Sequence, residues 1–105
     1  MRFNPDAGYL YFLLLGRAYL FANDIEQARF NLHEAVVRNP LDVETRVYRT
    51  AVLAAAGDAA AARWEAEEIR TLDPGFSIDG WLATYPLTSP AHRAWLRTLV
   101  ASAQS

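Results

Sequence analysis

Apolar residues recur at intervals of three or four along most of the 105-residue chain, and this spacing predicts amphipathic helices. Val47, Ala51 and Ala54 in the middle of the chain, and Trp95 and Leu99 near its end, are examples. No run of residues alternates apolar and polar positions for long enough to predict a strand, so we expect an all-α fold. The expected helices lie near residues 7–22, 25–38, 42–56, 59–72, 77–84 and 90–102.

Residues that favour helix ends stand at several of these boundaries. Asp24 is followed three positions later by Gln27, a spacing that is typical of a capping pair at a helix start. Asp42 can accept a hydrogen bond from the first turn of the next helix in the same way. Gly57 followed by Asp58 combines a residue that ends helices with one that begins them. These residues predict short turns between successive helices.

Two Pro residues mark a repeat. Pro40 and Pro74 each follow a helix-like stretch and stand 34 positions apart, which is the period of the tetratricopeptide repeat (TPR). The block from Tyr9 to Asp42 has the signature residue types of that repeat at Phe12, Leu15, Gly16, Tyr19, Ala28, Leu32, Ala35 and Pro40. This block resembles a TPR, and the resemblance implies an antiparallel helix pair within a right-handed α-solenoid.

The small residues of this block have a physical role. Gly16 and Ala28 stand where the two helices of the pair are expected to cross, and small side chains there allow the helix axes to approach closely. Phe12, Tyr19 and Leu32 are expected to fill the space around the crossing.

The second block, residues 43–76, is a degenerate copy. It keeps Ala62 and Pro74 but has Arg46 and Arg49 at positions where the repeat has large apolar residues, and Thr50 where it has Gly. The repeat pattern ends after residue 76. We therefore expect one domain over residues 1–105, with a first repeat at about 9–42, a second at about 43–76 and a pair of capping helices at about 77–102.

A narrower resemblance covers nearly the whole chain. The run from Leu72 to Ser77 reads L-D-P-G-F-S, and it is followed by Tyr85-Pro86-Leu87 and by Pro90-Ala91-His92. These runs are similar to the end of TPR regions attached to bacterial adenylate or guanylate cyclases of class III. The resemblance implies a regulatory or assembly module of a bacterial signalling protein. It implies no cyclase activity in these residues, because the chain has neither a glycine-rich phosphate loop nor strands to hold metal-binding carboxylates.

Charge and composition narrow the choice of partners. Ten basic and twelve acidic residues give a net charge of -2, which disfavours binding to nucleic acid or to an anionic membrane. The chain has no Cys and therefore no disulfide or thiolate site. The apolar run from Tyr9 to Leu15 is cut by Arg17 and is too short for a membrane span. A signal peptide is disfavoured because Asp6 would lie in its basic region and Arg17 in its apolar region. We expect a cytoplasmic protein or an internal piece of one.

Candidate catalytic and metal-binding residues are few. His33 and Glu34 are adjacent, and adjacent helix residues point about 100° apart, so both side chains cannot face one ion. His92 stands alone near the start of the last helix. An acidic cluster is expected to be a solvated helix face: Glu65, Glu67 and Glu68. We expect no catalytic residue, cofactor or metal.

The alternative is a small helical ligand-binding or enzymatic domain, which a His beside a buried carboxylate would favour. A helix-turn-helix nucleic-acid binder is disfavoured because the Arg residues are scattered among acids.

The partner surface is expected to be an apolar groove on the inner face of the helices. Leu13 and Arg17 occupy the positions where chaperone-binding TPR domains have the Lys and Asn of their carboxylate clamp, so this chain does not match that mode of peptide binding. The residues expected to line the groove are Leu10, Leu13, Arg17, Leu20, Val47, Ala51 and Ala54. Arg17, Arg46 and Arg49 either meet a ligand there or form ion pairs with a neighbouring helix.

The first helix is apolar on every side, which is typical of a helix buried on both faces. The terminal repeat of a solenoid needs a polar outer side to stay in solution. We therefore expect this helix to pack against an upstream repeat or against a second copy of the chain. The residues expected to mediate self-association are Leu10, Tyr11 and Leu14. Together these observations predict a non-enzymatic protein-interaction or self-association module.

Overall fold

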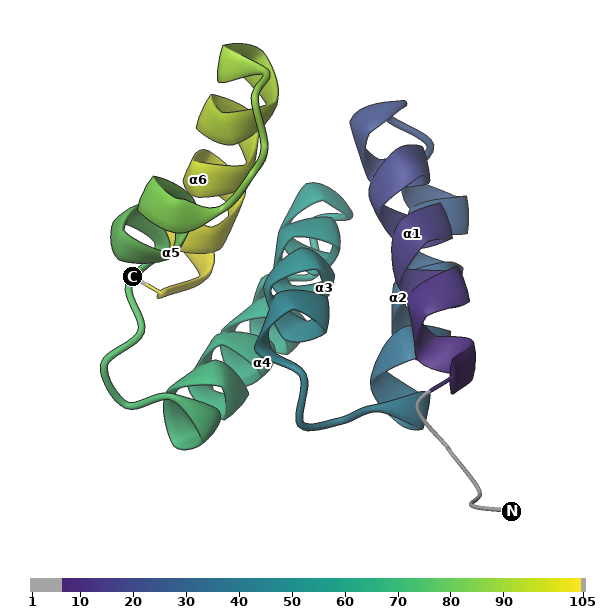
Figure 1. The fold of residues 1–105 in the computed structure, drawn as a ribbon, viewed down its shortest axis with the longest axis horizontal. Coiled ribbons are helices and arrows are strands. Elements are labelled where there is room, and N and C mark those ends of the chain that lie inside the picture. The colour runs from purple at the N-terminus through teal and green to yellow at the C-terminus, as the bar shows by residue number, and fades with distance from the viewer. Residues whose placement is uncertain (1–6, 105) are drawn as a thin grey trace.

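The computed structural model describes residues 7–104, and over that range it contains six α-helices and no strand (Figure 1). The helices are α1 (Ala7–Phe21), α2 (Ile25–Arg38), α3 (Val43–Ala55), α4 (Ala59–Leu72), α5 (Ile78–Thr84) and α6 (Pro90–Gln104). The all-α prediction is confirmed for this part of the chain, which is 79% helical. The predicted helix boundaries lie within two residues of the observed ones.

Five helices begin at a side chain that accepts a hydrogen bond from the backbone N–H three residues further on. These N-cap residues are Asp24, Asp42, Asp58, Ser77 and Ser89. Each such bond satisfies a backbone donor that has no partner within the helix, and losing one typically costs about 1 kcal/mol. At the end of α3, Gly57 has a φ of 83°, a left-handed conformation that Gly adopts without steric cost. The capping pattern therefore fixes where the chain turns.

The first hairpin, α1 with α2, depends on the absence of a side chain at one position. A Cβ added to Gly16 would lie 2.4 Å from Cγ of Leu32, far inside van der Waals contact. Leu32 and Ala28 on α2 are both completely buried. The prediction that Gly16 allows the two helices to approach closely is confirmed.

The second hairpin, α3 with α4, lies beside the first, and α3 is the central helix of the domain (Figure 1). It packs against α1, α2, α4 and α6. Most of its residues are consequently buried, including the polar residues Thr45, Arg46 and Thr50. The largest fully buried apolar side chains come from five of the six helices: Leu13, Leu20, Leu32, Val47, Tyr48, Val52, Leu53, Ile69, Leu96 and Val100.

The C-terminal pair, α5 and α6, closes the other end of this core. Leu96 and Val100 on α6 are fully buried, and α6 packs against both α3 and α4. The turn between the two helices is held by Arg93, whose guanidinium donates to three backbone carbonyls at 2.6–3.3 Å, those of Leu82, Tyr85 and Leu87. Leu82 lies in the last turn of α5, and Tyr85 and Leu87 follow that helix, so these bonds tie α6 to the end of α5 and to the segment after it.

Candidate interaction surface

Four of the seven residues expected to line a groove are buried in the core instead: Leu13, Leu20, Val47 and Ala51. The prediction that these side chains meet a partner is wrong, because they face the interior that α1, α2, α3 and α6 enclose. Of the other three, Ala54 is half-buried, Arg17 keeps a third of its side-chain surface exposed, and Leu10 is exposed. The structure thus leaves only part of the predicted groove open to a partner.

A cluster of aromatic and charged side chains lies where α1, α3 and the end of α5 meet. The guanidinium of Arg17 lies over the rings of Tyr48 and Tyr85, at 5.6 and 5.9 Å from their centroids. It also lies 3.5 Å from Glu44, a long ion pair. The hydroxyl of Tyr48 donates to that of Tyr85 at 3.1 Å, and the hydroxyl of Tyr85 donates to Glu44. Arg17 therefore forms an ion pair with a neighbouring helix, which is one of the two alternatives that the sequence left open.

Burial controls the ionisation of the two phenols in this cluster. It raises the pKa of Tyr85 far above its ordinary value, and the hydrogen bond that Tyr85 donates to Glu44 raises it further. Burial also raises the pKa of Tyr48, while the hydrogen bond to Tyr85 and the nearby Arg17 act in the opposite direction. Both side chains are consequently neutral hydrogen-bond donors at ordinary pH.

A second charged cluster surrounds Glu65, which is completely buried. Arg46 donates to one carboxylate oxygen of Glu65 at 2.8 Å, and Arg49 donates to the other. The expectation that Glu65 lies on a solvated face is wrong, because residue 65 falls on the side of α4 that Ala62, Ile69 and their neighbours bury. Two guanidinium groups compensate one buried carboxylate, and removing it would leave two cations partly buried.

The two histidines lie on different helices, His33 on α2 and His92 on α6. Nδ1 of His33 lies 3.3 Å from Nη2 of Arg49, at the edge of the Glu65 cluster. His92 stacks on Phe21 with ring centroids 4.2 Å apart, and this contact joins α6 to α1. Within residues 7–104, no group of three or more His, Asp or Glu side chains could hold a metal ion.

Three large apolar side chains are exposed close together on α1. Leu10, Tyr11 and Leu14 are 50, 64 and 56% exposed. Leu10, Leu14 and Ala18 recur at intervals of four and therefore form a row along one side of the helix. Below, these three residues and Tyr11 are called the α1 face. Other large apolar side chains are also exposed, at 56–73%: Phe30 and Val37 on α2, Leu41 after α2, and Trp64 on α4. None of the six helices in the described range is long and apolar enough to cross a membrane.

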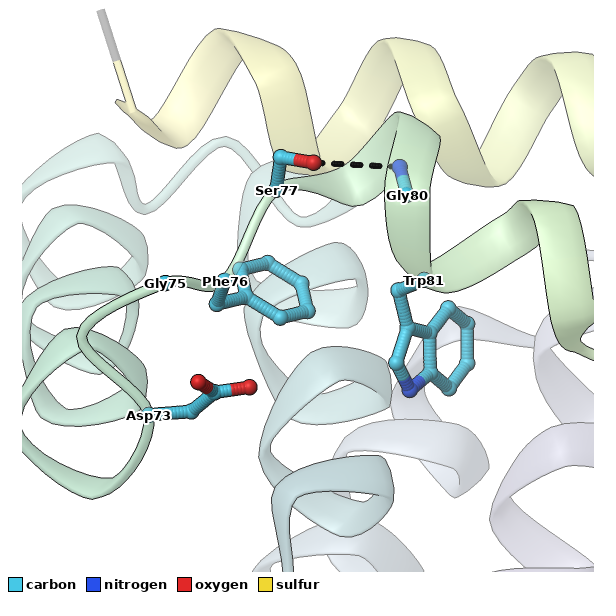
Figure 2. A pocket seen from close by; sticks show the side chains of 6 residues that line it. All are labelled: Asp73, Gly75, Phe76, Ser77, Gly80 and Trp81. Atoms are coloured by element: carbon cyan, nitrogen blue, oxygen red, sulfur yellow. Dashed lines mark hydrogen bonds between the residues drawn. The ribbon is translucent and has the colours of Figure 1, made fainter.

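The structure also contains a small open pocket where α4 ends and α5 begins (Figure 2). Its volume is about 220 Å³. It is lined by Asp73, Gly75, Phe76, Ser77, Gly80 and Trp81. The sequence does not predict this pocket, because the run from Asp73 to Ser77 indicates a repeat boundary, a helix start and the narrower resemblance, and none of these implies a ligand site.

Comparisons of the chain with protein-family models, with curated proteins and with solved structures find no match.

Proposed function

We propose that this domain is a non-catalytic TPR-type interaction module that binds protein through the α1 face. The observation that carries the proposal is the exposure of Leu10, Tyr11 and Leu14 at neighbouring positions of one helix. Large apolar side chains gathered on a surface favour association with another protein over contact with water. The TPR resemblance supports the same class of function, because TPR-type units stack through their helix pairs.

The α1 face is a better docking surface than the inner groove. Four groove residues are inaccessible, and Arg17 is engaged by Glu44, Tyr48 and Tyr85. On the α1 face, by contrast, a partner helix meets Leu10 and Leu14 with the small Ala18 in the same row. Small residues in such a row allow a second helix to approach closely.

In the isolated domain the partner on the α1 face is a second copy. An α1–α1 contact buries the same apolar row twice, once from each copy, as in most symmetric dimers. Fully burying a large apolar side chain is worth roughly 1.5–3 kcal/mol, and these side chains are already partly buried. Association itself costs at least about 4 kcal/mol, so we expect a weak, reversible dimer. In a longer protein an upstream repeat would take the same place.

The similarity of the C-terminal runs to TPR regions of class III cyclases supports a regulatory or assembly role in a bacterial cytoplasmic signalling protein. Under this proposal the chemistry belongs to another domain. A small-ligand function has one observation in its favour, the pocket between α4 and α5, which is separate from α1.

Sedimentation equilibrium tests the proposal. The wild-type chain is expected to associate reversibly at high micromolar concentration, and the double variant Leu10→Glu/Leu14→Glu is expected to be monomeric. Both should have the same helical content, because these side chains lie outside the core. The double variant Phe30→Glu/Val37→Glu places two charges on exposed apolar positions of α2 and is the matched control. A wild-type monomer throughout, or equal dissociation by the control, would refute the α1 face.

A further inference from the structure

The pocket between α4 and α5 is small. Its volume of about 220 Å³ lies below the roughly 300–1,000 Å³ of sites that enclose drug-sized ligands. A nucleotide or a comparable cofactor would extend far beyond it. The pocket therefore fits a single functional group, such as the end of a long side chain or a small organic ion.

The lining of the pocket favours a cation. Figure 2 shows the carboxylate of Asp73 and the rings of Phe76 and Trp81 around one open space. Aromatic faces attract cations through their quadrupole, and a carboxylate adds a full negative charge. None of the six lining residues is basic. Asp73 takes part in no ion pair among residues 7–104, so its charge is not already neutralised by Arg.

Two of the residues that line the pocket are glycines. A Cβ added to Gly75 would meet only the carboxylate of Asp73, at 3.8 Å, so a side chain there would stand beside the acid. Gly80 lies inside the helix α5, where Gly is among the least favourable residues, and a Cβ there would lie 2.9 Å from Oγ of Ser77. Ser77 in turn accepts a hydrogen bond from the backbone N–H of Gly80 at 3.0 Å.

The indole of Trp81 is held in place from outside the pocket. It stacks on Tyr85 with centroids 4.1 Å apart and planes 21° from parallel. It also meets the buried Tyr48 edge to face at 6.3 Å. A ring fixed in this way loses little conformational freedom when a ligand binds, which favours binding.

We propose that this pocket binds an alkylammonium group, with the cation beside the rings of Phe76 and Trp81 and close to the Asp73 carboxylate. The ammonium is either that of a small free quaternary ammonium ion such as choline or that of a Lys side chain on a protein. The proposal does not depend on association through α1, because none of the lining residues belongs to that helix.

Titration with tetramethylammonium, followed by NMR, tests the proposal. The indole N–H signal of Trp81 is assigned with the variants Trp64→Phe and Trp95→Phe, since the chain has three Trp. The expected result is a saturable shift of this signal at millimolar ligand. Asp73→Asn is expected to weaken binding at least threefold, and Phe76→Leu is expected to weaken it as well. Glu67→Gln removes an exposed charge of α4 that does not line the pocket and is expected to have no effect.

Two comparisons identify the ligand. tert-Butanol has the shape of tetramethylammonium without its charge and should not compete with it. Nα-acetyl-lysine N-methylamide and choline then separate the sources: tighter binding of the lysine amide assigns the site to a protein side chain, and tighter binding of choline assigns it to a small free quaternary ammonium ion. The proposal is overturned if no saturable shift occurs, if tert-butanol competes equally, or if Asp73→Asn binds as the wild type does.

Discussion

The first and last helices, α1 and α6, are both 15 residues long, but the exposed side of α6 is polar and the exposed side of α1 is apolar. α6 buries Leu96 and Val100, and its exposed positions carry only small or polar residues such as Arg97 and Thr98. α1 also buries apolar residues, yet it exposes Leu10 and Leu14. A helix that ends a repeat array needs a polar outer side. Under the proposed function, the α6 end of the core, whose outer side is polar, is the finished end, and the α1 end, whose outer side is apolar, is the open end that receives a further protein surface.

The largest expected loss of stability comes from a change at the finished end. Leu96→Ala removes a fully buried side chain between α6 and the helices beneath it, and we expect a loss of about 2–5 kcal/mol in the free energy of unfolding. Urea denaturation measures it. The matched change Leu14→Ala, at the open end, should alter stability by no more than about 0.5 kcal/mol. Equal losses from the two variants would contradict the difference between the ends.

A second prediction concerns the tie between the C-terminal pair and the rest of the domain. Tyr85→Phe removes the hydrogen bond to Glu44, and bonds to charged groups are worth about 1.5–3 kcal/mol. The variant should therefore unfold at lower urea concentration at neutral pH.

The same variant should change the response to alkaline pH. Because the pKa of Tyr85 is raised in the folded state, the unfolded chain loses this proton first, above its ordinary pKa of 10.0. Wild-type stability should accordingly fall as the pH rises beyond about 10. The stability of Tyr85→Phe should fall less steeply with pH, retaining the part due to Tyr48. Parallel pH profiles for the two proteins would contradict the buried hydrogen bond.

The smallest expected effect on stability tests the packing of α1 on α2. Gly16→Ala places a Cβ against the buried Leu32, and overpacking of this kind costs about 1–3 kcal/mol. The better helix propensity of Ala returns up to about 1 kcal/mol, so we expect a net loss of roughly 1 kcal/mol. Thermal unfolding measures it. Gly75→Ala, where the new Cβ meets nothing closer than 3.8 Å, is the control that should leave the melting temperature almost unchanged.

Local sequence features predicted most of the helical architecture. The N-caps at Asp24, Asp42 and Asp58 fix helix starts through bonds spanning three residues, and such bonds do not depend on the tertiary fold. The close approach at Gly16 was also predictable, because a Gly inside an apolar helix is costly unless another element needs the space. The helix boundaries and the first hairpin follow from these features.

The groove could not be predicted in the same way. Tyr85 reaches Tyr48 from 37 positions away, and no local pattern indicates that the end of α5 meets α1 and α3. Glu65 is a different case. It stands three residues after Ala62 and four before Ile69, so the helical phase of α4 already places it on the buried side. Arg46 and Arg49 occupy repeat positions that are usually apolar. Together with the buried position of Glu65, they would have predicted the buried ion pairs.

Thiol labelling tests the α1 face most directly, because the chain has no Cys of its own. Leu14→Cys and Trp64→Cys place single thiols at two sites that are both 56% exposed, one on the α1 face and one on α4. At low protein concentration both should react rapidly with a maleimide. As the concentration rises, the reaction at position 14 should slow while the reaction at position 64 stays constant. A rate at position 14 that does not depend on protein concentration would contradict association through α1.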